Sequence, residues 1–61
     1  MAMVRIEVYR NGAWTVRSEG EADVTAEQVL ASLPDYCLQY AHQAFLDGKY
    51  IGQCYAKGRV K

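Results

Sequence analysis

The first part of the chain alternates between apolar and polar residues in two runs. Apolar side chains fill every second position from Val4 to Val8, and Trp14 and Val16 repeat this period of two. Such a period is typical of strands that bury one face. Asn11-Gly12 lies between the runs and is a common turn sequence. The pattern therefore predicts a β-hairpin.

The two faces of this hairpin decide which turn we expect. A two-residue turn at Asn11-Gly12 would pair Val8 with Thr15, an apolar residue with a polar one. A three-residue turn over Arg10–Gly12 pairs Val8 with Trp14 and keeps one face apolar. We therefore predict the longer turn, with Gly12 in the left-handed position of a bulged turn.

A polar stretch and a helix follow. Residues 18–24 are polar and contain glycine, so we interpret them as a connection. Thr25-Ala-Glu-Gln28 matches a capping box, in which the first and last side chains bond each other's backbone. Ala26, Val29, Leu30 and Leu33 give this short helix an apolar face. We expect the helix to stop or kink at Pro34, because proline disfavours helix at the preceding residue.

Residues 35–47 allow two interpretations. As a helix, Asp35–Asp47 would gather Cys37, Leu38, Ala41, Ala44 and Phe45 on one side, with Gly48 just past its end. As a strand it contains no Val, Ile or Thr. We predict the helix; the alternative is a second hairpin that turns at Asp47-Gly48. Lys49–Lys57 is then expected to form the last strand.

These elements predict an α+β fold in a single small domain over residues 1–61. The expected order is β-β-α-α-β, a two-layer arrangement. Its three-stranded, mainly antiparallel sheet would be covered on one face by two short helices or one kinked helix.

The charges are sorted by segment. Every charged residue from Ser18 to Gly48 is acidic, whereas the flanks hold all seven basic residues and one acid, Glu7. If the flanks are strands and the middle is helical, the sheet is basic and the helical side acidic. Such a separation of charge would orient an approaching partner.

Length and composition set the class of protein that we expect. A chain of 61 residues buries only about 60% of the surface that it exposes when unfolded, so its stability margin is thin. A second subunit would add stability, and a homodimer is possible. The sequence shows no leader and no apolar run long enough to span a membrane. We expect a cytoplasmic protein whose two cysteines are reduced.

The sheet face away from the helices is the candidate site. We expect Tyr9 and Tyr55 to lie there among Arg5, Arg17 and Lys57, with Tyr50, Gly52, Cys54 and Ala56 on the opposite, inward side. Rings and cations on a sheet suit a protein interface or single-stranded nucleic acid. An ordinary solvated face would look the same.

Catalytic and metal-binding chemistry has little support. Cys37, His42 and Cys54 are the one possible metal set, but three ligands make a poor structural zinc site, and His42 would face away from Cys37 on the predicted helix. The sequence contains no glycine-rich phosphate loop before a helix. We therefore expect no metal, no cofactor and no enzymatic activity.

The sequence thus predicts a small non-enzymatic binding module that docks a basic, tyrosine-containing sheet face onto a larger protein. An inhibitor or adaptor of the kind that phages and mobile elements carry fits this size. The alternative function is binding of single-stranded nucleic acid on the same face.

Overall fold

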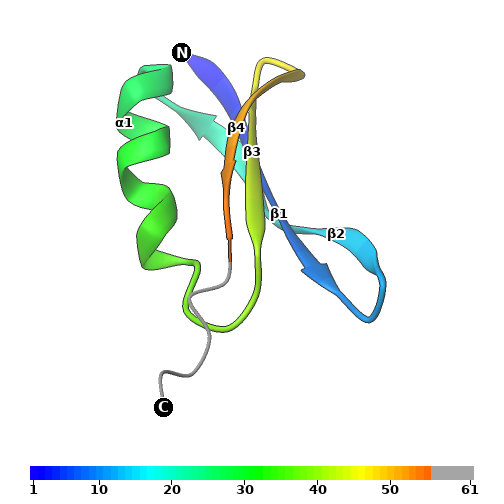
Figure 1. Ribbon diagram of the computed structural model, residues 1–61. Coiled ribbons are helices and arrows are strands. Elements are labelled where there is room, and N and C mark those ends of the chain that lie inside the picture. The colour runs from blue at the N-terminus through cyan, green and yellow to red at the C-terminus, as the bar shows by residue number, and fades with distance from the viewer. Residues whose placement is uncertain (56–61) are drawn as a thin grey trace.

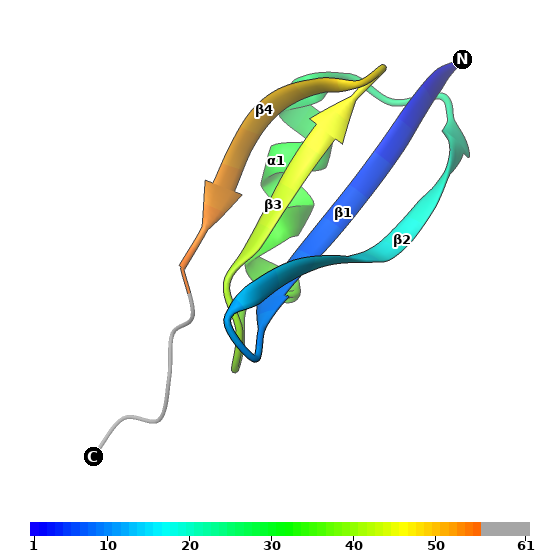
Figure 2. The same cartoon turned by 90° about the vertical axis from the view of Figure 1, so that its right-hand side faces the viewer.

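The computed structural model describes residues 1–55 as a four-stranded antiparallel sheet with one short α-helix. The strands lie in the order β2-β1-β3-β4, and Figures 1 and 2 show the helix on one face. The predicted α+β class is confirmed, but the predicted numbers, three strands and two helices, were wrong. None of the described helices is long and apolar enough to cross a membrane. The elements are β1 (Ala2–Arg10), β2 (Ala13–Ala22), α1 (Ala26–Ser32), a 3-10 turn (Leu33–Asp35), β3 (His42–Leu46) and β4 (Lys49–Cys54).

The β1–β2 hairpin turns on two residues, so the predicted three-residue turn was wrong. Asn11 and Gly12 have φ angles of 54° and 81°, as a tight hairpin turn with two left-handed residues requires. Tyr9 consequently pairs with Trp14, and Val8 pairs with Thr15. Trp14 and Val16 of β2 therefore lie on the face opposite to Val8. Helix α1 packs against β3 and β4 rather than this part of the hairpin, so burial beneath the helix does not oppose this register.

A bulge at Arg17 carries β2 further than predicted. Glu7 pairs with Val16 and Ile6 pairs with Ser18, so Arg17 is the extra residue between them. The strand then continues to Ala22, which corrects the interpretation of residues 18–24 as a polar connection. After the bulge, the parity of β2 is reversed.

The start and the end of helix α1 follow the sequence. Thr25 accepts a hydrogen bond from the backbone N–H of Gln28, and the Gln28 side chain accepts one from the Thr25 N–H, so the predicted capping box is confirmed. The helix ends at Ser32, and Pro34 lies in the first turn of the following 3-10 segment. The predicted stop at proline is therefore also confirmed.

The predicted helix over Asp35–Asp47 is wrong, and the alternative hairpin is correct. The turn residues Asp47 and Gly48 have φ angles of 53° and 80° and join β3 to β4. Asp47 is tied to β1, since its carboxylate accepts a hydrogen bond from the Met3 N–H at 3.0 Å. Pairing of β3 with β1 on one side and β4 on the other outweighs its low intrinsic strand preference.

The core lies between α1 and the middle of the sheet. Val29 and Leu33 pack with Ile6 of β1 and Ala44 of β3. Helix α1 crosses β3 and β4, where a Cβ on Gly52 would come within 2.6 Å of a Leu30 methyl carbon. The β1–β2 hairpin extends away from the helix (Figure 1), so the helix covers only half of this face.

Candidate binding surfaces

Exposed aromatic side chains gather on the face of the sheet that α1 does not cover, which we call the outer face. Figure 2 views the molecule from this side, with α1 behind the strands. The rings of Tyr9 and Trp14 pack at 5.2 Å, and those of Phe45 and Tyr50 pack edge to face at 5.7 Å. Tyr9 is 44% and Tyr50 50% exposed. The apolar part of the outer face consists of Met3, Tyr9, Trp14, Val16, Phe45 and Tyr50.

The cationic side chain of Arg5 lies among these rings. The Arg5 guanidinium lies over the Phe45 ring, 4.4 Å from its centroid, and its Nε is 3.1 Å from a carboxylate oxygen of Glu7. The other oxygen of Glu7 accepts a hydrogen bond from the Gln43 amide at 2.6 Å. Arg5 is thus fixed by stacking and by an ion pair, and its charge is balanced locally.

The predicted separation of charge between the two layers is wrong. Glu19 and Glu21 lie on β2 and therefore belong to the sheet. Arg17 lies over the ring of Tyr36, 5.3 Å from its centroid, and so reaches the helical side. The bulge explains this reversal, since Arg17 has no partner on β1 to hold it in the regular alternation.

The predicted site residues are not all brought together. Tyr9 and Arg5 lie on the outer face, Tyr55 follows the end of β4 with 75% of its surface exposed, and Arg17 lies elsewhere. Lys57 and Ala56 lie outside the described residues.

Trp14, Phe45 and Tyr50 belong to the outer face but were missed. Trp14 was assigned inward because of the expected turn, and Phe45 was placed on a helix. Tyr50 was assigned to the inward side, but a bulge beside Ala44 and Phe45 turns it outward. The Asp47-Gly48 turn was the signal that could have placed Phe45 and Tyr50 on facing strands.

Cys37 and Cys54 form a disulfide, which corrects the expectation of reduced thiols. Their Cα atoms are 6.3 Å apart. His42 is buried beside them, with Nδ1 at 3.6 Å from the Cys37 sulfur and 2.9 Å from the Tyr40 carbonyl oxygen. The prediction that His42 faces away from Cys37 was therefore wrong, because this segment is not a helix.

This cluster has a second chemical capacity if the disulfide is reduced. One donor atom each from Cys37, His42 and Cys54 lies within 4.8 Å of the others, and all three are ligands that zinc accepts. In the oxidised protein both sulfur atoms are already bonded to each other. The carbonyl of Tyr40 also competes for Nδ1 of His42.

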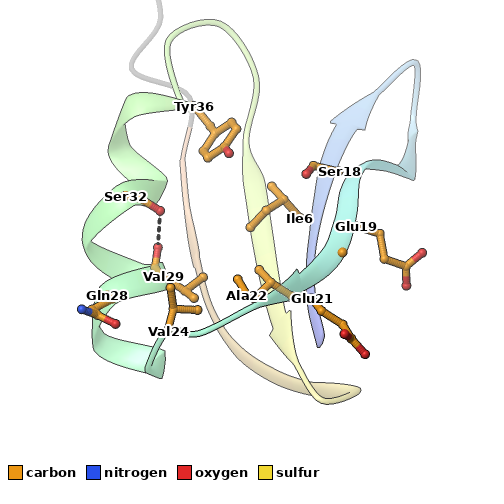
Figure 3. A pocket seen from close by; sticks show the side chains of 12 residues that line it. Ile6, Ser18, Glu19, Glu21, Ala22, Val24, Gln28, Val29, Ser32 and Tyr36 are labelled. Carbon is orange, nitrogen blue, oxygen red and sulfur yellow. Dashed lines mark hydrogen bonds between the residues drawn. The ribbon is translucent and has the colours of Figure 1, made fainter. Parts of the chain in front are cut away.

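A groove of about 360 Å³ runs between α1 and the second half of β2. Figure 3 shows Ile6, Ala22 and Val29 directed into it, whereas the carboxylates of Glu19 and Glu21 point away. The groove is the uncovered half of the apolar core. Its walls also carry the polar side chains of Ser18, Gln28 and Ser32, so the groove is apolar with a polar rim.

No family model matches the chain, and no similar protein was found among curated proteins or solved structures.

Proposed function

We propose that the chain is a small non-enzymatic binding module, of the inhibitor or adaptor type, that docks the outer face onto a larger protein. The observation that supports this most directly is the aromatic character of a sheet face that α1 leaves uncovered (Figure 2). Tyrosine, tryptophan, phenylalanine and methionine are the residues enriched at protein interfaces, and contiguous apolar patches mark interaction sites.

The rings of the outer face are held in place before a partner arrives. Tyr9 and Trp14 pack on each other, and the Tyr50 hydroxyl donates a hydrogen bond to the Gln53 side chain at 3.0 Å. Side chains that are already ordered lose less entropy on binding. The aromatic pairs therefore have the properties of interface anchors.

The charge of the outer face favours a protein over a nucleic acid. Nucleic-acid binders combine stacking rings with cations that neutralise phosphates. The cation here is Arg5, which Glu7 already balances, and β2 adds Glu19 and Glu21 near its far end. We therefore infer a partner surface that is largely apolar and close to neutral, with a hydrogen-bond acceptor for the Tyr9 hydroxyl.

Photocrosslinking in the native host tests this proposal. A photoreactive phenylalanine analogue would replace Trp14 or Tyr50 on the outer face, or Ala31 on the exposed side of α1 as a control. We expect one defined protein adduct from positions 14 and 50 and none from position 31. Adding Tyr9→Ala to the Tyr50 analogue should abolish its adduct, and circular dichroism should show that each variant is folded.

Three outcomes would contradict the proposal. A nuclease-sensitive adduct would indicate nucleic acid, and an adduct of twice the chain mass would indicate a homodimer. Equal adducts from positions 31 and 50 would show that contact does not depend on the outer face.

A further inference from the structure

A second hollow lies on the helical side of the sheet, near the tip of the β1–β2 hairpin. It has a volume of about 460 Å³, within the range of small-ligand pockets. Arg10 and Arg17 reach it from the hairpin, while Tyr36 and Tyr40 reach it from the segment before β3. It is separate from the outer face, so a ligand could bind there whether or not the outer face docks onto a protein.

The two guanidinium groups of the hollow are positioned but not neutralised. Arg10 lies 4.9 Å from the centroid of the Tyr40 ring, and Arg17 lies 5.3 Å from that of Tyr36. Stacking of this kind orients a guanidinium and leaves its N–H donors free. Within residues 1–55 the one ion pair is Arg5–Glu7, so neither Arg10 nor Arg17 is paired with an acid.

His42 adds a buried nitrogen without a partner to the wall. Its ring is 1% exposed and lies 5.5 Å from that of Tyr36. Nδ1 lies 2.9 Å from the Tyr40 carbonyl oxygen, which can only accept, so Nδ1 carries a hydrogen. Nε2 has no hydrogen-bond partner among the described residues. In this neutral tautomer Nε2 can only accept, so a carboxylate would not bond to it, whereas an N–H or O–H group on the body of a ligand would supply the missing bond.

Charge and shape define the ligand. The hollow contains two guanidinium groups and the carboxylate of Asp35, a net charge of +1 when the histidine is neutral. One carboxylate balances this charge, whereas a phosphate dianion would exceed it. The tyrosine rings and Leu38 provide apolar walls. We infer that the hollow binds a carboxylate attached to an apolar or aromatic body, through the N–H groups of Arg10 and Arg17.

Benzoate is a suitable probe because it joins a carboxylate to a flat ring. We would titrate the whole oxidised chain with sodium benzoate and follow the side-chain resonances of His42 and of both arginines by NMR. We expect saturable shifts at these residues. Benzamide, which has the same shape without the charge, should bind at least about tenfold more weakly, as expected for hydrogen bonds to a charged group.

Matched variants locate the binding. Arg17→Gln should weaken benzoate binding about tenfold or more, and Arg17→Lys should restore only part of it, because lysine lacks the planar fork. Lys49→Gln removes the same charge at the other end of the sheet and should change affinity less than about twofold. Arg17 and Lys49 are both exposed, so neither substitution should disturb the core.

Three results would overturn the inference: shifts that never saturate, equal binding of benzoate and benzamide, or equal losses in Arg17→Gln and Lys49→Gln.

Discussion

The β1–β2 and β3–β4 hairpins turn in the same way but differ in what covers them. Asn11-Gly12 and Asp47-Gly48 have matching left-handed φ angles, and each hairpin contains one bulge. From Ala13 to Glu21 β2 is exposed, whereas every residue of β3 is buried or half-buried. The second hairpin has α1 above it and a disulfide at its end, while the first extends past the helix (Figure 1). Equal turns therefore do not give equal strands: one hairpin contributes to the core and the other presents side chains.

The largest expected difference concerns apolar truncation. Leu33→Ala removes a side chain that is 2% exposed beneath β3 and β4, and should cost about 2–5 kcal/mol of unfolding free energy. Val16→Ala on the first hairpin, where the valine is 54% exposed, should cost less than about 0.5 kcal/mol. Urea denaturation measures both. Similar losses would show that β2 is as well packed as the second hairpin.

Reduction of the disulfide at the end of the second hairpin should lower the stability of the fold. Cys37 and Cys54 are 17 residues apart, and closing a loop of this size stabilises a protein by about 3 kcal/mol. A reductant should therefore lower the urea midpoint of the natural chain. The Cys37→Ser/Cys54→Ser variant should not respond to it. Two reactive thiols in the untreated, denatured protein would show instead that the cysteines are not bonded.

The two turns should respond equally to the same substitution. Gly12→Ala and Gly48→Ala each force a left-handed φ on a residue with a Cβ, which costs about 1–2 kcal/mol. Neither Cβ would meet another atom within 4 Å, so the cost is one of backbone conformation alone. Thermal unfolding of both variants checks this. A clearly larger loss at Gly48 would mean that cover by the helix also affects the turn.

The smallest expected difference in stability is between alanine substitutions at two glycines within strands, Gly52 and Gly20. Gly52→Ala on β4 would place a Cβ 2.6 Å from a Leu30 methyl carbon and should cost about 1 kcal/mol, because half-exposed Leu30 can shift. Gly20→Ala on β2 meets nothing within 4 Å and should be neutral or stabilising by a few tenths of a kcal/mol. The double variant Gly52→Ala/Leu30→Ala tests the clash: Gly52→Ala should cost less in the Leu30→Ala background than in the natural chain, and the cost that remains is that of a Cβ at a φ of 159°.

The same contrast explains what the sequence could predict of the fold. Alternation in β1 and the capping box at Thr25 are local signals, and the structure confirms the elements that they indicate. β3 carries no such signal, since His42–Leu46 contains no β-branched residue and also fits an amphipathic helix. Its strand conformation comes from pairing with β1, which lies far before it in the sequence, and with β4, which follows it. Neither pairing is visible in the residues of β3 themselves.

The residues of the candidate surfaces could be predicted only where the strand register could be predicted, because the register decides which face each side chain occupies. Arg5 and Tyr9 lie on β1, whose own alternation is uninterrupted, and were placed on the correct face. Arg17 is the bulged residue, and an insertion of this kind leaves no mark in the alternation. The proximity of Cys37 and Cys54 could be estimated from chain lengths, but their bond and the place of His42 required the path of the chain before β3.

Strand β1 has a consequence for how the chain assembles. It pairs with β2, its neighbour in sequence, and with β3, which begins more than thirty residues later. Each hairpin can form from residues that are close in sequence. The two hairpins join only when β1 pairs with β3, and this pairing requires the long segment between these strands to close into a loop. One edge of β1 can thus pair early, with β2, whereas its other edge is paired only when β3 docks against it.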